Sequence, residues 1–81
     1  MITLTDATKA TSRSVDWFGY SVPARVLVVA YKDSTAIYTY DAPPSAYREM
    51  LAAPSKGVFA NRLDERYTYR RITSAEVQGA P

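Results

Sequence analysis

The sequence predicts one small α+β domain, in which an antiparallel three-stranded meander packs against one helix and is followed by a short second helix and a C-terminal strand. Three segments rich in valine and aromatic residues are separated by short polar breaks, as in strands joined by turns. A proline pair then precedes apolar residues at helical spacing. With 81 residues, the chain has room for one core, expected over 12–72, with 1–11 and 73–81 as flexible or peripheral tails.

The three strands of the meander are expected at 14–20, 25–31 and 35–41. Pro23 breaks the chain after the first strand, because proline fixes φ and has no N–H for the ladder. The second strand is rich in valine, which suits a sheet interior. In the third strand, the side-chain period of two puts Tyr38 and Tyr40 on one face and Ile37 on the other.

The first helix is expected to begin at the proline pair 43–44, since proline is tolerated in the first helical turn. Tyr47, Met50 and Leu51 then fall at i, i+3 and i+4 and form one apolar stripe. Pro54 ends this helix.

Ser55 can cap a second helix over 56–63, in which Phe59 and Leu63 share a face. Residues 66–72 alternate in a way that predicts the last strand.

Composition excludes several classes of protein. The chain has no Cys and no His, so disulfides and the common zinc, haem and iron–sulfur ligand sets are absent, and we expect no cofactor. No apolar run is long enough for a membrane span, and the N-terminal residues do not have the order of a secretory signal, so we expect a cytoplasmic protein. A net charge of +2 mildly favours anionic partners. A core this small also favours self-association into a homo-oligomer.

The sequence does not predict an enzyme. Without His or Cys, nucleophilic and acid–base roles would fall to serine, threonine, tyrosine, lysine and carboxylates. No serine lies in a nucleophile elbow, and the carboxylates are scattered along the chain.

Residues 56–71 are locally basic, with five cationic residues against two acidic ones, a charge of +3. Phe59, Tyr67 and Tyr69 are interleaved with these charges. Cations release counterions from phosphates and aromatic rings stack on bases, so this composition suits a nucleic-acid or nucleotide surface. The alternative is a solvated face in which acids and bases pair with each other.

Two further features allow two interpretations each. The segment Ser55, Lys56 and Gly57 lies at a predicted helix N-terminus, where backbone amides and the helix dipole favour an anion, but a simple helix cap explains the same residues. Tyr38 and Tyr40 can stack on bases, or they can pack beneath the helix as part of the core.

Taken in order, these residues resemble the KTSC domain, a short module found at the C-terminus of some lysyl-tRNA synthetases and as a free-standing bacterial or phage protein. The central tyrosine, any residue, tyrosine motif of that family matches residues 38–40. The sequence departs from the family pattern at Ala60, Asp64 and Glu65. The resemblance extends over the residues Gly19, Tyr20, Leu27, Val29, Tyr31, Tyr38, Thr39, Tyr40, Pro43, Tyr47, Leu51, Ser55, Lys56, Gly57, Phe59, Asn61, Tyr67, Tyr69, Arg70, Arg71 and Ile72. It implies a role in RNA binding.

The favoured function is therefore a small non-enzymatic binding module for a phosphate-bearing ligand, either RNA or a nucleotide. The alternative is a phage-like oligomeric inhibitor that sequesters a host nucleotide signal or blocks a host defence protein. The residues expected to bind the ligand are Lys56, Gly57, Phe59, Arg62, Arg66, Tyr67, Tyr69, Arg70 and Arg71.

Overall fold

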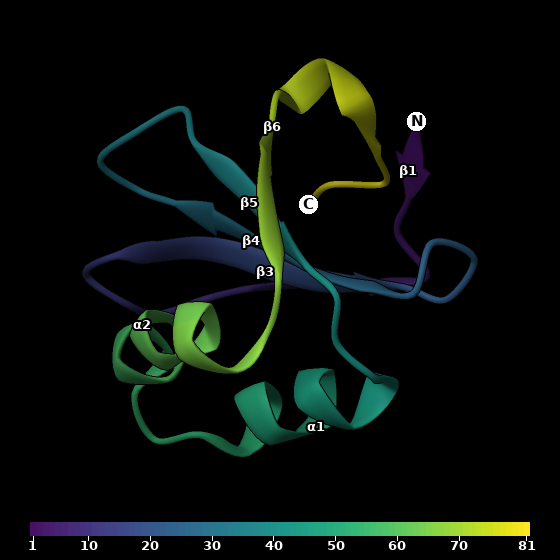
Figure 1. Ribbon diagram of the computed structural model, residues 1–81. Helices are drawn as coiled ribbons and strands as arrows, with labels where there is room; N and C mark the ends of the chain where they lie inside the picture. The colour runs from purple at the N-terminus through teal and green to yellow at the C-terminus, as the bar shows by residue number, and fades with distance from the viewer.

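The computed structural model describes residues 1–81 and confirms the α+β class (Figure 1). It contains two α-helices, one 3₁₀ turn and seven strands. No helix is both long and apolar enough to cross a membrane. In chain order the elements are β1 (Ile2–Thr3), β2 (Asp6–Lys9), β3 (Val15–Ser21), β4 (Val26–Tyr31), β5 (Ile37–Tyr40), α1 (Pro44–Ala52), α2 (Lys56–Arg66), β6 (Tyr69–Ile72), η1 (Ser74–Glu76) and β7 (Val77–Gln78).

Five strands form one antiparallel sheet in the order β2-β3-β4-β5-β6, and β1 pairs in parallel with β7. Both helices cover the same face of the sheet, while the segment from η1 to β7 and the N-terminal residues lie toward the opposite face (Figure 1). The predicted C-terminal strand is present as β6 and joins the meander at one side, whereas β2, which extends the sheet on the other side, was not predicted.

The two terminal segments contribute more than the predicted peripheral tails would. Asp6–Lys9 pairs with β3 as an edge strand of the sheet, and Leu4 is buried at 9% exposure. Ile2 and Val77 pack against the same apolar cluster as Leu4. These short pairings were not predicted because threonine-rich segments of two to four residues show no sustained hydrophobic period.

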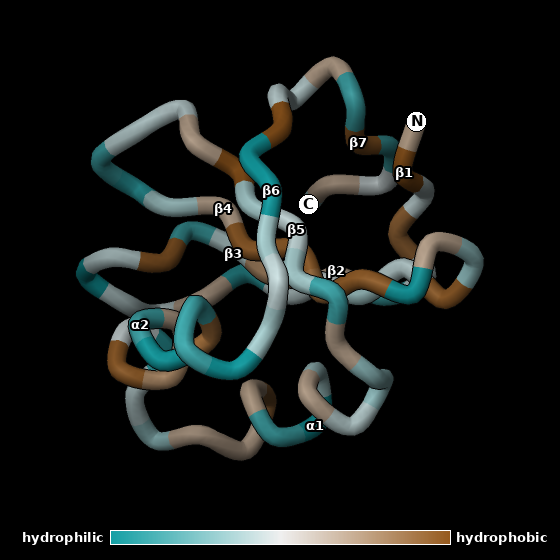
Figure 2. The backbone as a smooth tube through the Cα atoms, in the orientation of Figure 1, coloured by the Kyte–Doolittle hydropathy of each residue, from teal (hydrophilic) through white to brown (hydrophobic).

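Two apolar clusters fill the two sides of the sheet, and the hydrophobic residues concentrate along its strands (Figure 2). The cluster beneath the helices includes Phe18, Leu27 and Tyr40 from the sheet together with Met50 from α1 and Leu63 from α2. The cluster on the opposite face consists of Leu4, Trp17, Val26, Val28, Ala30, Ile37 and Ile72. Burial on both faces explains why β4 is an almost continuous apolar run.

A register shift in β3 allows this strand to supply both clusters. The pairing with β4 is irregular between Val15 and Trp17, where Asp16 is the extra residue of a bulge. Simple alternation would put Val15 and Trp17 on one face. Because of the bulge, Val15 packs beneath the helices and Trp17 packs on the opposite face.

Both helices begin near the predicted positions. Pro44 occupies the first turn of α1, and the Ser55 hydroxyl at the start of α2 accepts a hydrogen bond of 3.3 Å from the Val58 N–H. Helix α2 ends at Arg66 and not near residue 63, and the Tyr67 N–H donates to the Leu63 carbonyl at 2.9 Å. The extra turn brings Asp64 onto the helical face with Asn61, three residues earlier.

A substitution at Gly19 tests the packing of β2 against β3. A Cβ at this position would lie 2.5 Å from the Asp6 backbone carbonyl oxygen, so the edge strand would have to move. We expect Gly19→Ala to lower the free energy of unfolding by about 1–3 kcal/mol, measured by urea denaturation.

Gly57→Ala is the matched control for this experiment. The nearest atom to its Cβ would be the Ser14 hydroxyl oxygen, also at 2.5 Å, which can rotate away because it belongs to a side chain, and alanine is the better helix former by about 1 kcal/mol. An equal loss of stability in the two variants would contradict this description of β2.

Candidate functional site: a tyrosine-lined pocket

A pocket lined by four tyrosines and by polar side chains lies between the sheet and α2. It has a volume of about 380 Å³. Four tyrosines and two alanines supply most of its wall, and three polar residues complete it. The lining residues are Tyr31, Ser34, Ala36, Tyr38, Tyr40, Ala60, Asn61, Asp64 and Tyr69.

Strand pairing brings the tyrosines together from three strands. Tyr38 and Tyr40 lie on β5 and share its helix-facing side, as the period of two predicts. Tyr40 is directly opposite Tyr69 of β6, and Tyr31 ends the neighbouring strand β4. Ala60 of α2 is fully buried above the sheet, and its small side chain leaves room beside the rings.

The tyrosine rings meet at steep angles. The Tyr38 ring lies 5.8 Å from the Tyr31 ring at an interplanar angle of 71°, and 6.0 Å from the Tyr69 ring at 78°. Such edge-to-face pairs are favourable aromatic contacts and hold each ring in a fixed orientation. Tyr69 is 50% exposed, so the aromatic wall continues from the buried Tyr40 to the surface.

The hydroxyls of Tyr31 and Tyr40 share a hydrogen bond of 3.0 Å. Burial raises the pKa of both phenols above the ordinary tyrosine value, and the negative charge of Asp64 adds to this rise. The shared hydrogen bond raises the pKa of Tyr40 further and partly offsets the rise for Tyr31. These two hydroxyls are therefore neutral and mutually satisfied at the floor of the pocket.

Asp64 and Asn61 provide the polar side of the pocket. Both project from α2 at i and i+3, on one face of the helix. Neither side chain forms a hydrogen bond or an ion pair within the protein, in which the one ion pair is between Arg66 and Glu49. A carboxylate and a carboxamide are thus free to contact a ligand beside the aromatic rings.

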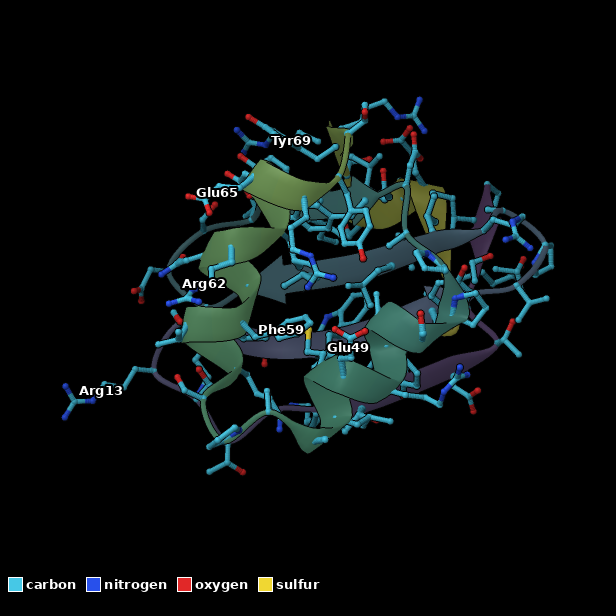
Figure 3. All side chains as sticks on the ribbon, turned by 60° about the horizontal axis from the view of Figure 1, so that its bottom comes forward. Arg13, Glu49, Phe59, Arg62, Glu65 and Tyr69 are labelled. Atoms are coloured by element: carbon cyan, nitrogen blue, oxygen red, sulfur yellow. The ribbon has the colours of Figure 1, made fainter.

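Two of the sequence-predicted binding residues have structural roles at the start of α2. The Lys56 ammonium donates to the carbonyls of Leu51 and Ala53, at 3.0 and 2.6 Å, and so caps the end of α1. Gly57 allows α2 to approach Ser14 closely. Together with residues 11–14 they line a second, polar hollow, and Asn61 lines both this hollow and the tyrosine-lined pocket. The Arg13 side chain points away from the domain (Figure 3).

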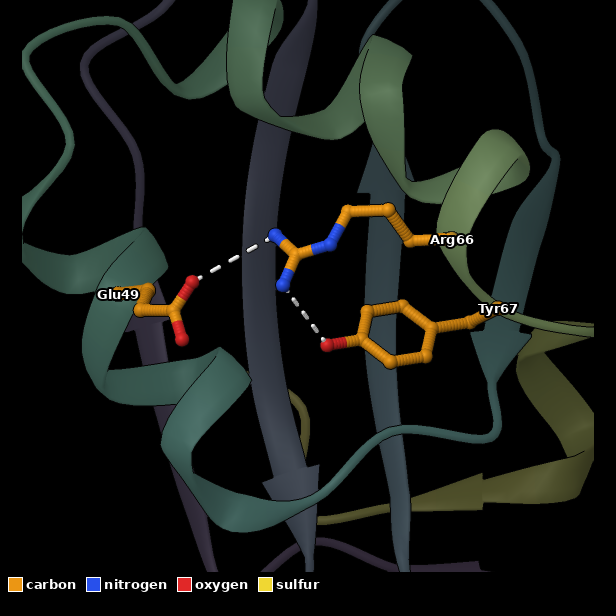
Figure 4. Close-up of polar contacts among 3 residues, drawn as sticks. All are labelled: Glu49, Arg66 and Tyr67. Carbon is orange, nitrogen blue, oxygen red and sulfur yellow. Dashed lines mark hydrogen bonds and ion pairs between the residues drawn. The ribbon is translucent and has the colours of Figure 1, made fainter.

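Arg66 and Tyr67 form a second contact between the helices (Figure 4). The Arg66 guanidinium lies 3.5 Å from the Glu49 carboxylate of α1 and donates to the Tyr67 hydroxyl at 3.3 Å. It also lies 5.2 Å from the centre of the Tyr67 ring. Phe59 is half-buried against the core between α2 and the sheet. These three predicted residues therefore support the helical layer.

The remaining predicted residues are separated by the geometry of their elements. Arg62 lies on the outer side of α2 (Figure 3). Arg71 is opposite Tyr38 in the sheet and shares the helix-facing side with Tyr69, whereas Arg70 is opposite Thr39 and points to the other side. Tyr69 therefore lines the pocket, Arg71 lies next to the lining residue Tyr38 without lining the pocket itself, and Arg70 and Arg62 point elsewhere.

The sequence-based site contained Tyr69 and omitted the other eight of the nine lining residues that the structure brings together. Tyr38 and Tyr40 were considered for stacking, and the structure gives them different positions, because Tyr40 is buried and Tyr38 is half-buried. Asn61 and Asp64 could have been found from their helical spacing together with the period-two face of β5. Tyr31 had no such signal, since its approach to Tyr40 depends on the register of β4 and β5.

The raised pKa values of Tyr31 and Tyr40 predict a loss of stability in alkali. Above about pH 10 the unfolded chain releases these phenolic protons while the folded protein retains them, so the free energy of unfolding falls as pH rises. In the double variant Tyr31→Phe/Tyr40→Phe, the fall in urea midpoint from about pH 8 to pH 11 should be shallower. Tyr69→Phe, which removes an exposed hydroxyl, is the control. If the urea midpoint falls equally with pH in the wild type, the double variant and the control, the raised pKa values of Tyr31 and Tyr40 are contradicted.

Comparison with known proteins agrees with the resemblance. Residues 11–69 match the family model of the KTSC domain. The fold is similar to the crystal structure of a KTSC domain protein from Yersinia pestis, with a TM-score of 0.73 and 23% sequence identity, over 83% of this chain and 96% of that chain. No curated protein matches the chain. Because the family model covers most of the sequence, the chain belongs to the KTSC domain family.

Proposed function

We propose that the protein is a non-enzymatic, cytoplasmic binding module for a phosphate-bearing ligand, RNA or a nucleotide, and that the tyrosine-lined pocket receives the base. One observation carries the proposal. Arg71 is paired with the lining residue Tyr38 and lies on the same side of the sheet, so a cation is next to the aromatic pocket. A nucleotide needs this combination of an aromatic surface for its base and a cation for its phosphate.

The aromatic part of the proposal rests on the accessible rings. Tyr69 is half exposed and Tyr38 is half-buried, so both can contact a ligand, whereas Tyr40 forms the floor. Stacking of one base on an aromatic side chain contributes about 1–3 kcal/mol in nucleic-acid-binding proteins.

The electrostatic part rests on arginines without carboxylate partners. Arg66 forms the one ion pair of the structure, so Arg62, Arg70 and Arg71 keep their charge for external anions. Among these, Arg71 is the one that lies next to the pocket, and we assign the phosphate contact to it. Arg62 and Arg70 would add to a longer-range attraction for RNA.

The second candidate function, an oligomeric inhibitor of a host factor, would require a surface for a second copy. The sheet offers two edges, β2 and β6, with unpaired backbone groups. On β6, however, Arg70 and Arg71 would bring like charges together if two copies paired along this edge. Light scattering after size exclusion separates the candidates, because the binding-module proposal requires no oligomer.

The positions of Arg70 and Arg71 on opposite sides of one strand provide a matched test. We expect Arg71→Gln to weaken binding of a short single-stranded RNA and to reduce the slope of log affinity against log salt by about 1, as expected for one lost phosphate contact. Arg70→Gln removes the same charge from the other face and should weaken binding less. Fluorescence anisotropy across a salt series measures both effects.

Two results would contradict the proposal. The first is RNA and nucleotide affinity that is undetectable or independent of salt. The second is an equal loss of affinity in the Arg70 and Arg71 variants, since this would indicate general charge attraction without a contribution from the pocket.

A further inference from the structure

We propose that the pocket selects guanine, through the carboxylate of Asp64 and the carboxamide of Asn61. This inference rests on the proposed function and specifies its ligand. It starts from a carboxylate and a carboxamide that line the pocket and have no partner within the protein. The tyrosine rings can stack on any base, so discrimination has to come from polar groups, and Asp64 is the charged one among those that line the pocket.

The chemistry of Asp64 restricts the choice of base. A carboxylate only accepts hydrogen bonds, and it can accept two at once from adjacent N–H groups. Guanine presents such a pair, N1–H and N2–H₂, side by side on one edge. Adenine and cytosine place an acceptor nitrogen beside their amino group, and the single N–H of uracil lies between two carbonyl oxygens. A carboxylate facing these three edges would meet at least one lone pair.

The Asn61 carboxamide provides hydrogen-bond donors beside the Asp64 carboxylate. It lies three residues before Asp64 on one face of α2, so both side chains can reach one edge of a planar ligand. A carboxamide has two N–H donors, which suit the O6 oxygen of guanine beside N1. The Asn61 amide then donates to O6 of guanine, while the Asp64 carboxylate accepts from N1–H and N2–H₂.

The pocket also fixes the orientation of a nucleotide. Its volume of about 380 Å³ is near the lower end of the range for small-molecule sites, about 300–1,000 Å³. The negative charge of Asp64 disfavours a phosphate inside, while Arg71 lies outside the pocket on β6, opposite the lining residue Tyr38. The base is therefore expected inside, between the rings and α2, with the phosphate toward Arg71.

The test compares the affinities of the intact protein for GMP, IMP, AMP, CMP and UMP by isothermal titration calorimetry, with inorganic phosphate as a further probe. GMP should bind more tightly than AMP, CMP and UMP by roughly 5- to 150-fold, the ratio expected for one bidentate contact. IMP lacks the N2 amino group and should fall between GMP and the others. A uridine hexamer with and without one guanosine repeats the comparison for RNA, which distinguishes a free nucleotide from a polymer as the source of the base.

Two variants assign the selectivity to its residue. Asp64→Asn replaces the second acceptor oxygen by a donor and should abolish the preference for GMP while leaving UMP binding equal or stronger. Glu65→Gln makes the same charge change at an exposed neighbour outside the pocket and should keep the preference.

The possible outcomes separate the two proposals. Salt-dependent binding of all nucleotides with equal affinity, or a preference for GMP that survives Asp64→Asn, overturns the guanine assignment and leaves the proposed function standing. Absence of binding to every nucleotide and to both hexamers overturns both.

Discussion

The pairing of β5 between β4 and β6 is the constraint on which the candidate site depends. Because side chains alternate along a strand, this register places Tyr38 and Tyr40 beneath α2 and brings Tyr69 and Arg71 beside them. A shift of one residue would exchange these side chains with those of the opposite face, which pack in the second apolar cluster. Since both faces of the sheet are buried, each cluster opposes such a shift and the register is fixed from both sides.

The pocket exists because small residues face large ones across this register. Ala36 and Ala60 lie among four tyrosine rings, and their short side chains leave space that the rings alone cannot fill. The edge-to-face contacts of Tyr38 with Tyr31 and Tyr69 fix the orientation of these rings beside the space. The extra turn of α2 then adds Asp64 to the pocket. Asp64, at which the sequence departs from the family pattern, is the residue to which we assign the proposed preference for guanine.

The fold class and the helix starts could be predicted from local signals: valine-rich strands, the proline pair and the serine cap. The roles of the charged residues could not, because they depend on tertiary contacts. Lys56 contacts the end of α1 and Arg66 contacts Glu49 only after the helices pack, so the sequence alone does not show these structural roles. Likewise Arg70 and Arg71 are neighbours in sequence, but strand geometry turns them to opposite faces.

The central claim is that the tyrosine-lined pocket, and not the general basic surface, receives the ligand. Chemical-shift mapping by two-dimensional NMR during titration with GMP tests this most directly. We predict that the largest changes fall on Tyr31, Tyr38, Asn61, Asp64 and Tyr69, with Arg71 next to them and little change at Arg62 or Arg70. Changes concentrated at Arg62 and Arg70, with the pocket residues unaffected, would contradict the account.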